Sequence, residues 1–184
     1  MLRVTQPVKT DRLLLRPFQL DDLDALHDIE SRPEVALYEY WGPRTREESA
    51  EALSRKAAQN GTAAEGEWLG LVICLADTGE LIGDVSLKWA SEKWRQGELG
   101  YVLSPDHQGR GYATEAAKAV LRLGFHEFAL RRIQAGADAR NTASIKVMER
   151  LGMRREAHFR GCAFVKDEWC DEVIYALLDT EFRP

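Results

Sequence analysis

Apolar and polar positions in the first part of the chain follow two periods, which predict a succession of strands and helices. Leu20, Leu23 and Leu26 lie three residues apart, and this spacing is typical of an amphipathic helix. Thr45 and Glu48 have the order of a capping box, which predicts the start of a second helix. We expect strands at 9–18, 67–76, 81–89 and 97–104, helices at 20–30 and 45–59, and an aromatic loop at 31–44.

The turn residues of the middle segment indicate how its strands are connected. Asp77 and Gly79 separate two apolar runs and suit a tight turn, so we expect an antiparallel hairpin there. The strand at 97–104 then extends this hairpin into a meander. In the second half we expect a helix at 110–129, a strand at 131–138, a helix at 141–153 and a hairpin of 157–167 with 169–178.

A strand, a helix and a further strand in this order predict a right-handed crossover between parallel strands. The fold class that follows is α+β: a mixed, mostly antiparallel central sheet flanked by helices, with a central strand-helix-strand-helix unit and a C-terminal hairpin. We expect residues 1–184 to form a single domain, because 184 residues suffice for one self-supporting core.

Composition favours an intracellular protein that works in solution. No apolar run approaches the length that spans a bilayer, and no secretory signal pattern opens the sequence, so we expect no membrane and a cytoplasmic location. The three cysteines form no Cys-x-x-Cys pair, and we interpret them as reduced packing residues. Neither they nor the four histidines have the spacing of metal ligands, so we expect no metal.

The net charge of −5 is unevenly distributed along the sequence. Residues 107–160 carry eleven Lys and Arg against five Asp and Glu, whereas the remaining residues are strongly acidic. One part of the protein could therefore attract an anion and the other a cation. Basic runs with interleaved aromatic residues are absent from the sequence, which disfavours nucleic acid as a partner.

The stretch "SPDHQGRGYATEA" leaves a predicted strand through a glycine-rich turn and opens the longest predicted helix. Such a turn presents unpaired backbone N–H groups at the positive end of the helix dipole, and this arrangement suits a phosphate. The stretch has neither the Gly-x-x-x-x-Gly-Lys-Ser/Thr of a P-loop nor the Gly-x-Gly-x-x-Gly of a dinucleotide fingerprint. Both of those interpretations are therefore excluded.

What the stretch does contain is Gln-x-x-Gly-x-Ala, at Gln108, Gly111 and Ala113. This pattern resembles the signature of the GNAT superfamily of acyl-coenzyme A N-acyltransferases. The segments "TDRLLLRPFQLDDLDAL", "GELIGDVSL", "NTASIKVMERLGM" and "RGCAFVKDEWCDEVIYALLDTEF" are similar, in matching order, to the RimJ/RimL-like branch. Members of that branch acetylate protein N-termini, and the branch includes relatives that act on small amines.

The resemblance implies acetyl-coenzyme A as co-substrate. Backbone N–H groups between Gln108 and Thr114 would bind its diphosphate, with Arg110 adding charge unless that side chain is merely a solvated arginine. A backbone N–H near Tyr101 to Leu103 would polarise the thioester carbonyl. The implied coenzyme-binding residues are Tyr101, Val102, Leu103, Gln108, Gly109, Arg110, Gly111, Tyr112, Ala113, Thr114, Asn141 and Ser144.

The catalytic residues implied by the resemblance are Asn141, Ser144 and Glu98. Many family members carry a tyrosine acid where this chain has Met148, which cannot donate a proton, so Ser144 would serve instead by hydrogen-bonding the sulfur. Asn141 and Ser144 also suit plain helix capping. Glu98 is the candidate base, with a water relay as the alternative; strand alternation places it opposite Tyr101 unless a bulge intervenes.

The acceptor side is expected among the early helices and the late hairpin. Tyr38, Tyr40 and Trp41 would bind the acceptor, and Glu34 and Glu39 could attract an ammonium group, unless the rings serve only in packing. We expect direct acetyl transfer to a primary amine, first a protein N-terminal α-amine. The alternatives are a small-molecule amine (polyamine, aminoglycoside or amino-acid-like) or a non-catalytic acyl-coenzyme A-binding module. Relatives suggest a homodimer.

Overall fold

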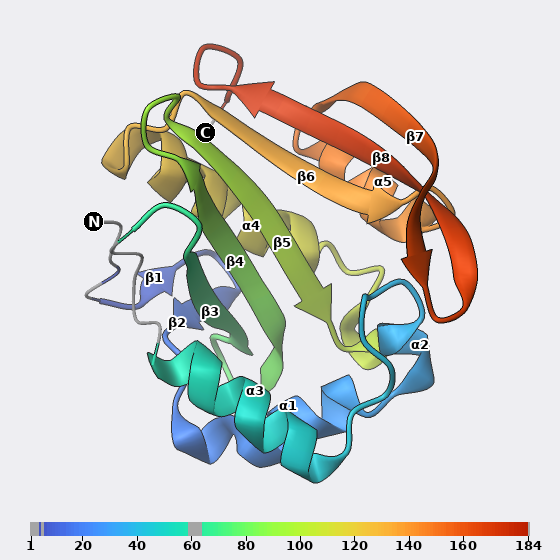
Figure 1. Ribbon diagram of the computed structural model, residues 1–184. Helices are drawn as coiled ribbons and strands as arrows, with labels where there is room; N and C mark the ends of the chain where they lie inside the picture. Colours follow the sequence, from blue (N-terminus) through green and yellow to red (C-terminus); the bar gives the residue numbers. More distant parts are fainter. Residues whose placement is uncertain (1–3, 5, 59–63, 184) are drawn as a thin grey trace.

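Residues 4, 6–58 and 64–183 are described by the computed structural model, which builds them around one eight-stranded sheet (Figure 1). The strands are β1 Val8–Lys9, β2 Leu13–Arg16, β3 Trp68–Leu75, β4 Leu81–Ser91, β5 Gln96–Leu103, β6 Arg132–Asp138, β7 Arg154–Val165 and β8 Glu168–Leu178. The α-helices are α1 Leu23–Glu30, α2 Pro33–Ala36, α3 Arg46–Ala58, α4 Tyr112–Arg122 and α5 Thr142–Arg150. The mixed, mostly antiparallel sheet flanked by helices that the sequence predicts is confirmed.

The strands from β1 to β5 follow one another as antiparallel neighbours, which confirms the meander. The predicted strand at 9–18 is wrong as a single element. The chain turns at Thr10, whose N–H donates to the carbonyl of Leu13 at 3.0 Å, and this turn divides the segment into β1 and β2. Leu20 is a second correction, because its side chain is 70% exposed while Leu26 is buried.

The second half contains the predicted crossover. β5 and β6 are parallel neighbours joined through α4, and β8 lies between β6 and β7, so the C-terminal hairpin completes the sheet. The predicted helix at 110–129 ends earlier as an α-helix: a single π-helical turn over Leu123–Glu127 follows α4. The aromatic loop contains the short helix α2, which the sequence interpretation missed. Residue 59, in the predicted second helix, lies outside the described residues.

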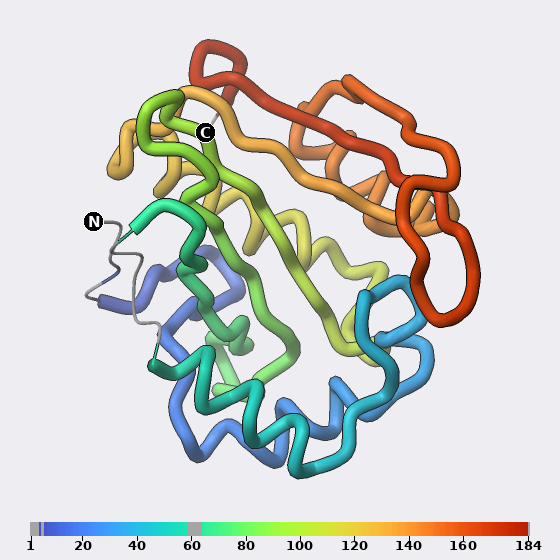
Figure 2. Tube along the Cα trace, viewed as in Figure 1, coloured from blue at the N-terminus to red at the C-terminus, as the bar shows by residue number. Residues whose placement is uncertain are grey.

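Helices cover the two faces of the sheet differently. Figures 1 and 2 show α1 and α3 on the near face, and α4 and α5 behind the strands. The larger apolar core packs α4 and α5 against residues such as Leu87 and Ile133, and a smaller core joins Leu26 and Leu53 to Val72 on the opposite face. Two of the three free cysteines are buried as expected, but Cys162 is exposed, so its interpretation as a packing residue is wrong.

The parallel strands β5 and β6 separate soon after they meet. Their pairing covers Gln96 with Arg132 to Glu98 with Gln134 and stops there. Beyond that point β5 stays paired with β4, and β6 with β8. The facing edges of residues 99–103 and 135–138 are therefore left without a strand partner, and the split opens toward the glycine-rich turn.

Candidate active site

The glycine-rich turn between β5 and α4 has the backbone that an anion cradle requires. Gly109 and Gly111 have positive φ angles of 76° and 84°, which glycine adopts without strain. Gly111 is the N-terminal cap of α4, and the first backbone bond of that helix joins the N–H of Glu115 to the carbonyl of Gly111 at 3.0 Å. The N–H groups of Tyr112, Ala113 and Thr114 therefore have no intrahelical acceptor.

Three side chains of the cradle bear on whether a ligand fits there. Thr114 Oγ1 is buried and has no hydrogen-bond partner among the described residues, and such an orphaned group indicates a missing polar partner. Arg110 is exposed, which fits both interpretations of that side chain. Gln108 instead braces the turn, because its amide donates to the carbonyl of Leu103 at 3.2 Å. The cradle therefore fits a diphosphate, held mainly by backbone.

The N-terminal hairpin holds this turn from outside, which the sequence interpretation missed. Arg12 forms an ion pair with Glu115 at 2.6 Å, lies over the ring of Tyr112 at 4.6 Å and donates to the carbonyl of Arg110 at 3.0 Å. The hydroxyl of Thr10 also donates to Glu115, at 2.6 Å. Burial disfavours the charged form of Glu115, but these donors prevail and lower its pKa. No local sequence signal joins residues more than 100 positions apart.

At the start of α5, the expected coenzyme residues form one hydrogen-bonded group with β5. Asn141 caps the helix, because its Oδ1 accepts the N–H of Ser144 at 3.0 Å. The Tyr101 hydroxyl lies 2.9 Å from Ser144 Oγ and 3.0 Å from the Ser144 carbonyl oxygen. Met148 is fully buried in the core. The structure thus brings Tyr101, Asn141 and Ser144 together.

Glu98 lies on the other face of the sheet. The pairing of β5 with β4 is regular from Gly97 to Leu103, so no bulge alters the alternation after Glu98. Because Tyr101 reaches α5, Glu98 must face the side covered by α1 and α3. It is also the last β5 residue paired with β6, at the closed end of the split. The expected base and the expected acid are therefore on opposite sides of the split.

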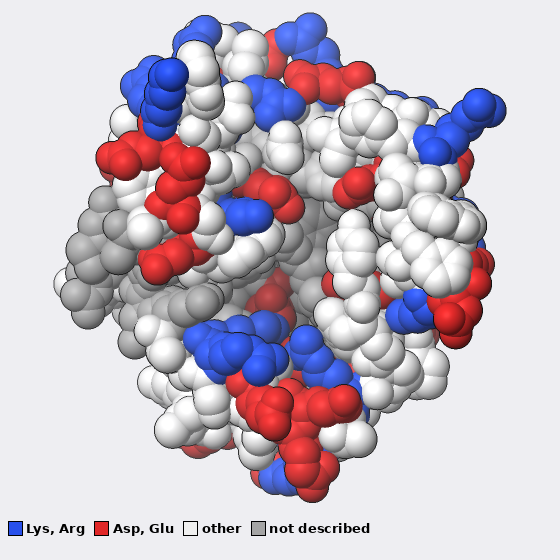
Figure 3. All heavy atoms as spheres, viewed as in Figure 1, with Lys and Arg blue, Asp and Glu red and all other residues white. Residues whose placement is uncertain are grey.

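Carboxylates from four distant segments gather on the face of Glu98. Burial, with the charge of Glu98 adding, raises the pKa of Glu172. Burial and the charge of Asp84 raise the pKa of Glu39 to about 6, despite nearby cations. Figure 3 shows a hollow near the centre of this face, with acidic residues in and around it and basic residues along its lower edge. The sequence interpretation missed Glu172; its local signal is a polar side chain on the same strand face as Ile174 and Ala176.

The three expected acceptor aromatics do not form one group. Tyr40 is 73% exposed, and partial desolvation together with the charges of Glu172 and Glu98 raises its pKa, so these carboxylates lie within electrostatic range of its hydroxyl. Trp41 instead packs under the guanidinium of Arg44 at 4.4 Å, in a polar pocket against α3. Tyr38 is partly buried. Tyr40 is thus linked electrostatically to Glu172 and Glu98, whereas Trp41 makes a separate contact with Arg44.

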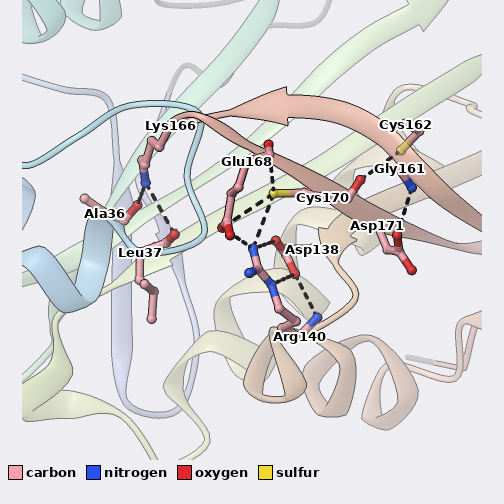
Figure 4. Close-up of polar contacts among 10 residues, drawn as sticks. All are labelled: Ala36, Leu37, Asp138, Arg140, Gly161, Cys162, Lys166, Glu168, Cys170 and Asp171. Carbon is pink, nitrogen blue, oxygen red and sulfur yellow. Dashed lines mark hydrogen bonds and ion pairs between the residues drawn. The ribbon is translucent and has the colours of Figure 1, made fainter.

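The tip of the C-terminal hairpin closes one end of the carboxylate face. Lys166, in the turn between β7 and β8, donates to the carbonyl oxygens of Ala36 and Leu37 at the end of α2 (Figure 4). Near the start of β8, the guanidinium of Arg140 bonds Asp138 at 2.7 Å and Glu168 at 2.8 Å. These contacts fix the hairpin to the α2 loop and to the segment just before Asn141.

Within residues 4, 6–58 and 64–183, no group of three His, Cys, Asp or Glu side chains is placed to hold a metal ion. In the same part of the chain, no helix is both long and apolar enough to cross a membrane.

Comparisons with known proteins agree with one another. Residues 12–154 match the family model described as "Acetyltransferase (GNAT) domain". The chain is 35% identical over 177 residues to an uncharacterized N-acetyltransferase, YnaD of Bacillus subtilis, covering 96% of this chain and 99% of that protein. Spermidine N(1)-acetyltransferase of Escherichia coli is 24% identical over 168 residues, covering 91% and 87%. A GNAT acetyltransferase structure from Bacillus anthracis superposes with a TM-score of 0.85 at 34% identity, covering 96% and 100%.

Proposed function

The chain belongs to the GNAT acetyltransferases and is an acyltransferase enzyme, and from this premise we propose that it transfers an acetyl group from acetyl-coenzyme A directly to a primary amine. The observation that carries the proposal is the split between β5 and β6, which leads from the anion cradle to the carboxylate face. A thioester held along the split would meet an amine that enters from the side of Glu98.

The cradle would hold the diphosphate of acetyl-coenzyme A through the N–H groups of residues 108–114. When bound, the coenzyme supplies an acyl group activated as a thioester. The unpaired β5 edge between Tyr101 and Leu103 supplies backbone donors for the carbonyl of that thioester, and removal of one such donor typically costs about 3 to 4 kcal/mol of transition-state stabilisation. Ser144 would donate a hydrogen bond to the sulfur, with Asn141 holding its helix turn.

Glu98 would accept the proton of the amine, directly or through a water. A general base must stand within hydrogen-bond reach of the proton or one water away, and Glu98 lies at the closed end of the split on the acceptor side. An α-amine has a pKa near 8 and is already partly neutral at neutral pH, whereas a lysine amine with a pKa near 10.4 needs far more help. This difference favours an α-amine as acceptor.

A protein N-terminal α-amine is the acceptor that we propose first, because the sequence resembles the RimJ/RimL-like branch. A small polyamine is the second candidate. Its support is that Glu39, Glu98 and Glu172 all lie within electrostatic range of Tyr40, since carboxylates and aromatic faces both attract ammonium groups. The spermidine acetyltransferase of Escherichia coli is a relative that acts on such an amine.

The test is thiol release from acetyl-coenzyme A with three acceptors: a peptide with a free N-terminus, spermidine, and an N-terminally blocked peptide containing lysine. We expect the first to give the fastest release, and spermidine as the best acceptor would establish the second candidate. The Gly111→Val variant should bind the coenzyme at least tenfold more weakly, because a β-branched residue is strained at a φ of 84°.

Gly79→Val is the matched control, because Gly79 has a φ of 75° in the β3–β4 turn and no atom near its added Cβ. It should lose similar stability but keep its coenzyme affinity. Coenzyme binding with no thiol release for any acceptor would contradict the enzyme proposal and leave an acyl-coenzyme A-binding module. Unchanged affinity in Gly111→Val would reject the cradle.

A further inference from the structure

The side chain of Tyr101 makes a contact that the proposed mechanism does not use. Its hydroxyl crosses from β5 to α5 and lies 2.9 Å from Ser144 Oγ and 3.0 Å from the Ser144 carbonyl oxygen. Burial raises the pKa of Tyr101 to about 12, against the opposing hydrogen bond from Ser144, so the phenol keeps its proton throughout the neutral range. Tyr101 is therefore a permanent donor of one hydrogen.

The Tyr101 hydroxyl has two possible acceptors, and its choice decides whether the hydroxyl hydrogen of Ser144 is free. If the phenol donates to the Ser144 carbonyl, the Ser144 hydroxyl must donate to the phenol oxygen, and its only hydrogen is used. If the phenol donates to Ser144 Oγ, the hydrogen of Ser144 remains free for a third group. The carbonyl does not require the phenol, because in an α-helix it accepts the N–H of the residue four positions on, here Met148.

We propose that the Tyr101 hydroxyl donates to Ser144 Oγ and holds that side chain, so that the hydrogen of Ser144 points to the sulfur of coenzyme A. Tyr101 is a positioning residue in this scheme and acts through Ser144. The inference rests on the proposed function. No proton is taken from Tyr101. As the C–N bond forms, the amine gives one proton to Glu98 or its water; as the C–S bond breaks, its electron pair goes to the sulfur. The resulting thiolate is stabilised by the hydrogen bond from Ser144 and takes one proton from solvent, so the reaction balances.

Tyr101 lies where β5 borders the split, and its side chain reaches α5. Its main chain belongs to the β5 segment that has lost β6 as a partner, so the backbone of Tyr101 borders the split. Its side chain spans the distance to a helix whose first turn is fixed by the Asn141 cap. One residue thus links the strand that would bind the thioester carbonyl to the hydroxyl that would face the sulfur.

Tyr175 provides a matched control within the same helix packing. It is a buried tyrosine on β8 whose hydroxyl donates to Glu149 of α5 at 3.4 Å, and no hydrogen bond joins it to Ser144 in the described residues. Tyr101→Phe and Tyr175→Phe each remove one hydroxyl between the sheet and α5. A purely structural role for Tyr101 predicts similar consequences for the two variants.

The first measurement is a kinetic double-mutant cycle. We expect Tyr101→Phe to lower kcat about three- to tenfold, with the KM for acetyl-coenzyme A changed less than twofold. Ser144→Ala should lower kcat at least as much, and adding Tyr101→Phe to it should cost less than twofold more. Tyr175→Phe should retain the wild-type kcat. Independent, multiplying losses in the double variant would overturn the proposal.

The second measurement does not depend on turnover. A hydrogen bond from Ser144 stabilises the thiolate of bound coenzyme A and lowers the pKa of this thiol below its value in free coenzyme A. Calorimetric affinity for coenzyme A should therefore rise as pH increases from 7 to 9 in the wild type, and rise less in Tyr101→Phe. Equal pH profiles would overturn the proposal. Wild-type protein that neither binds coenzyme A nor releases thiol would instead overturn the proposed function, and this inference with it.

Discussion

Among single residues, Glu39 shows how burial couples protonation to stability. Burial and the charge of Asp84 raise its pKa to about 6 in the folded state, above the ordinary value of about 4.3. The native state therefore binds more protons than the unfolded state between these values, so the unfavourable contribution of Glu39 develops as pH rises through this interval and persists above it. Below about pH 4 the contribution is absent.

Glu39→Gln should therefore be more stable than the wild type at pH 7.5, by up to about 2 kcal/mol, and closely similar to it at pH 4. Urea unfolding at the two pH values measures the difference. Glu34→Gln is the control, because Glu34 is an exposed glutamate of the neighbouring α2. A gain for Glu39→Gln that is equal at both pH values would show that its carboxyl is not strained by burial.

Local residue patterns were predicted well, and distant contacts were not. The capping box of Thr45 and Glu48 is confirmed: the N–H of Thr45 donates to the Glu48 carboxylate at 2.8 Å, and the N–H of Glu48 donates back to Thr45 Oγ1 at 3.3 Å. Both partners lie within one helical turn, where sequence spacing fixes geometry. The contacts of Arg12 with Glu115 and of Tyr101 with Ser144 depend on how the sheet folds, so no window of sequence contains them.

At the level of elements, hydrophobic periodicity predicted most strands and helices. It did not predict that the neighbouring strands β5 and β6 separate after Glu98. Alternation along β5 is the same before and after Glu98, although only the earlier part pairs with β6. The split depends on which strand each edge meets elsewhere: β4 continues beside β5, and β8 beside β6. The strand break at Thr10 escaped prediction because a side-chain and backbone turn there interrupts an apparently continuous pattern.

The tip of the C-terminal hairpin is fixed to the end of α2. Lys166 joins the β7–β8 turn to the last carbonyls of α2, so its loss should loosen one wall of the acceptor side. We expect Lys166→Met to raise the KM for the amine about three- to tenfold, because a hydrogen bond from a charged donor is lost. The KM for acetyl-coenzyme A should stay within twofold of wild type, because the cradle lies in another loop. Steady-state kinetics with each substrate varied in turn measures both.

Lys146→Met is the matched control for that loss of charge, since Lys146 is exposed on α5. Its two KM values should match those of the wild type. An unchanged amine KM in Lys166→Met would show that the hairpin contact has no part in acceptor binding. An equal rise in both KM values would show a general disturbance of the fold.

Across the whole molecule, the basic and acidic parts of the sequence lie in different regions of the fold. The basic stretch 107–160 supplies the cradle, α4, β6 and α5, whereas the carboxylates of Glu39, Glu98 and Glu172 face the opposite side. The sequence indicated that anion and cation sites would lie apart. It did not show that acids from the α2 loop, β5 and β8 would meet, because only the sheet order brings those segments together.

The larger core extends from Val4 to Phe182 and includes residues of every strand from β2 to β6 and β8. Because no strand group among the described residues has a separate core on that face, we expect residues 1–184 to unfold in one cooperative transition, with equal calorimetric and van't Hoff enthalpies. Acetyl-coenzyme A at 100 times its Kd should add about 2.7 kcal/mol to the free energy of unfolding and raise Tm by roughly 5 to 11 °C. Differential scanning calorimetry with and without coenzyme measures both.

The shift should persist in Gly79→Val and shrink in Gly111→Val, since only the second variant alters the cradle. Two separate transitions would contradict a single folding unit, and an equal shift in both glycine variants would mean that the stabilising ligand binds away from the turn at Gly111.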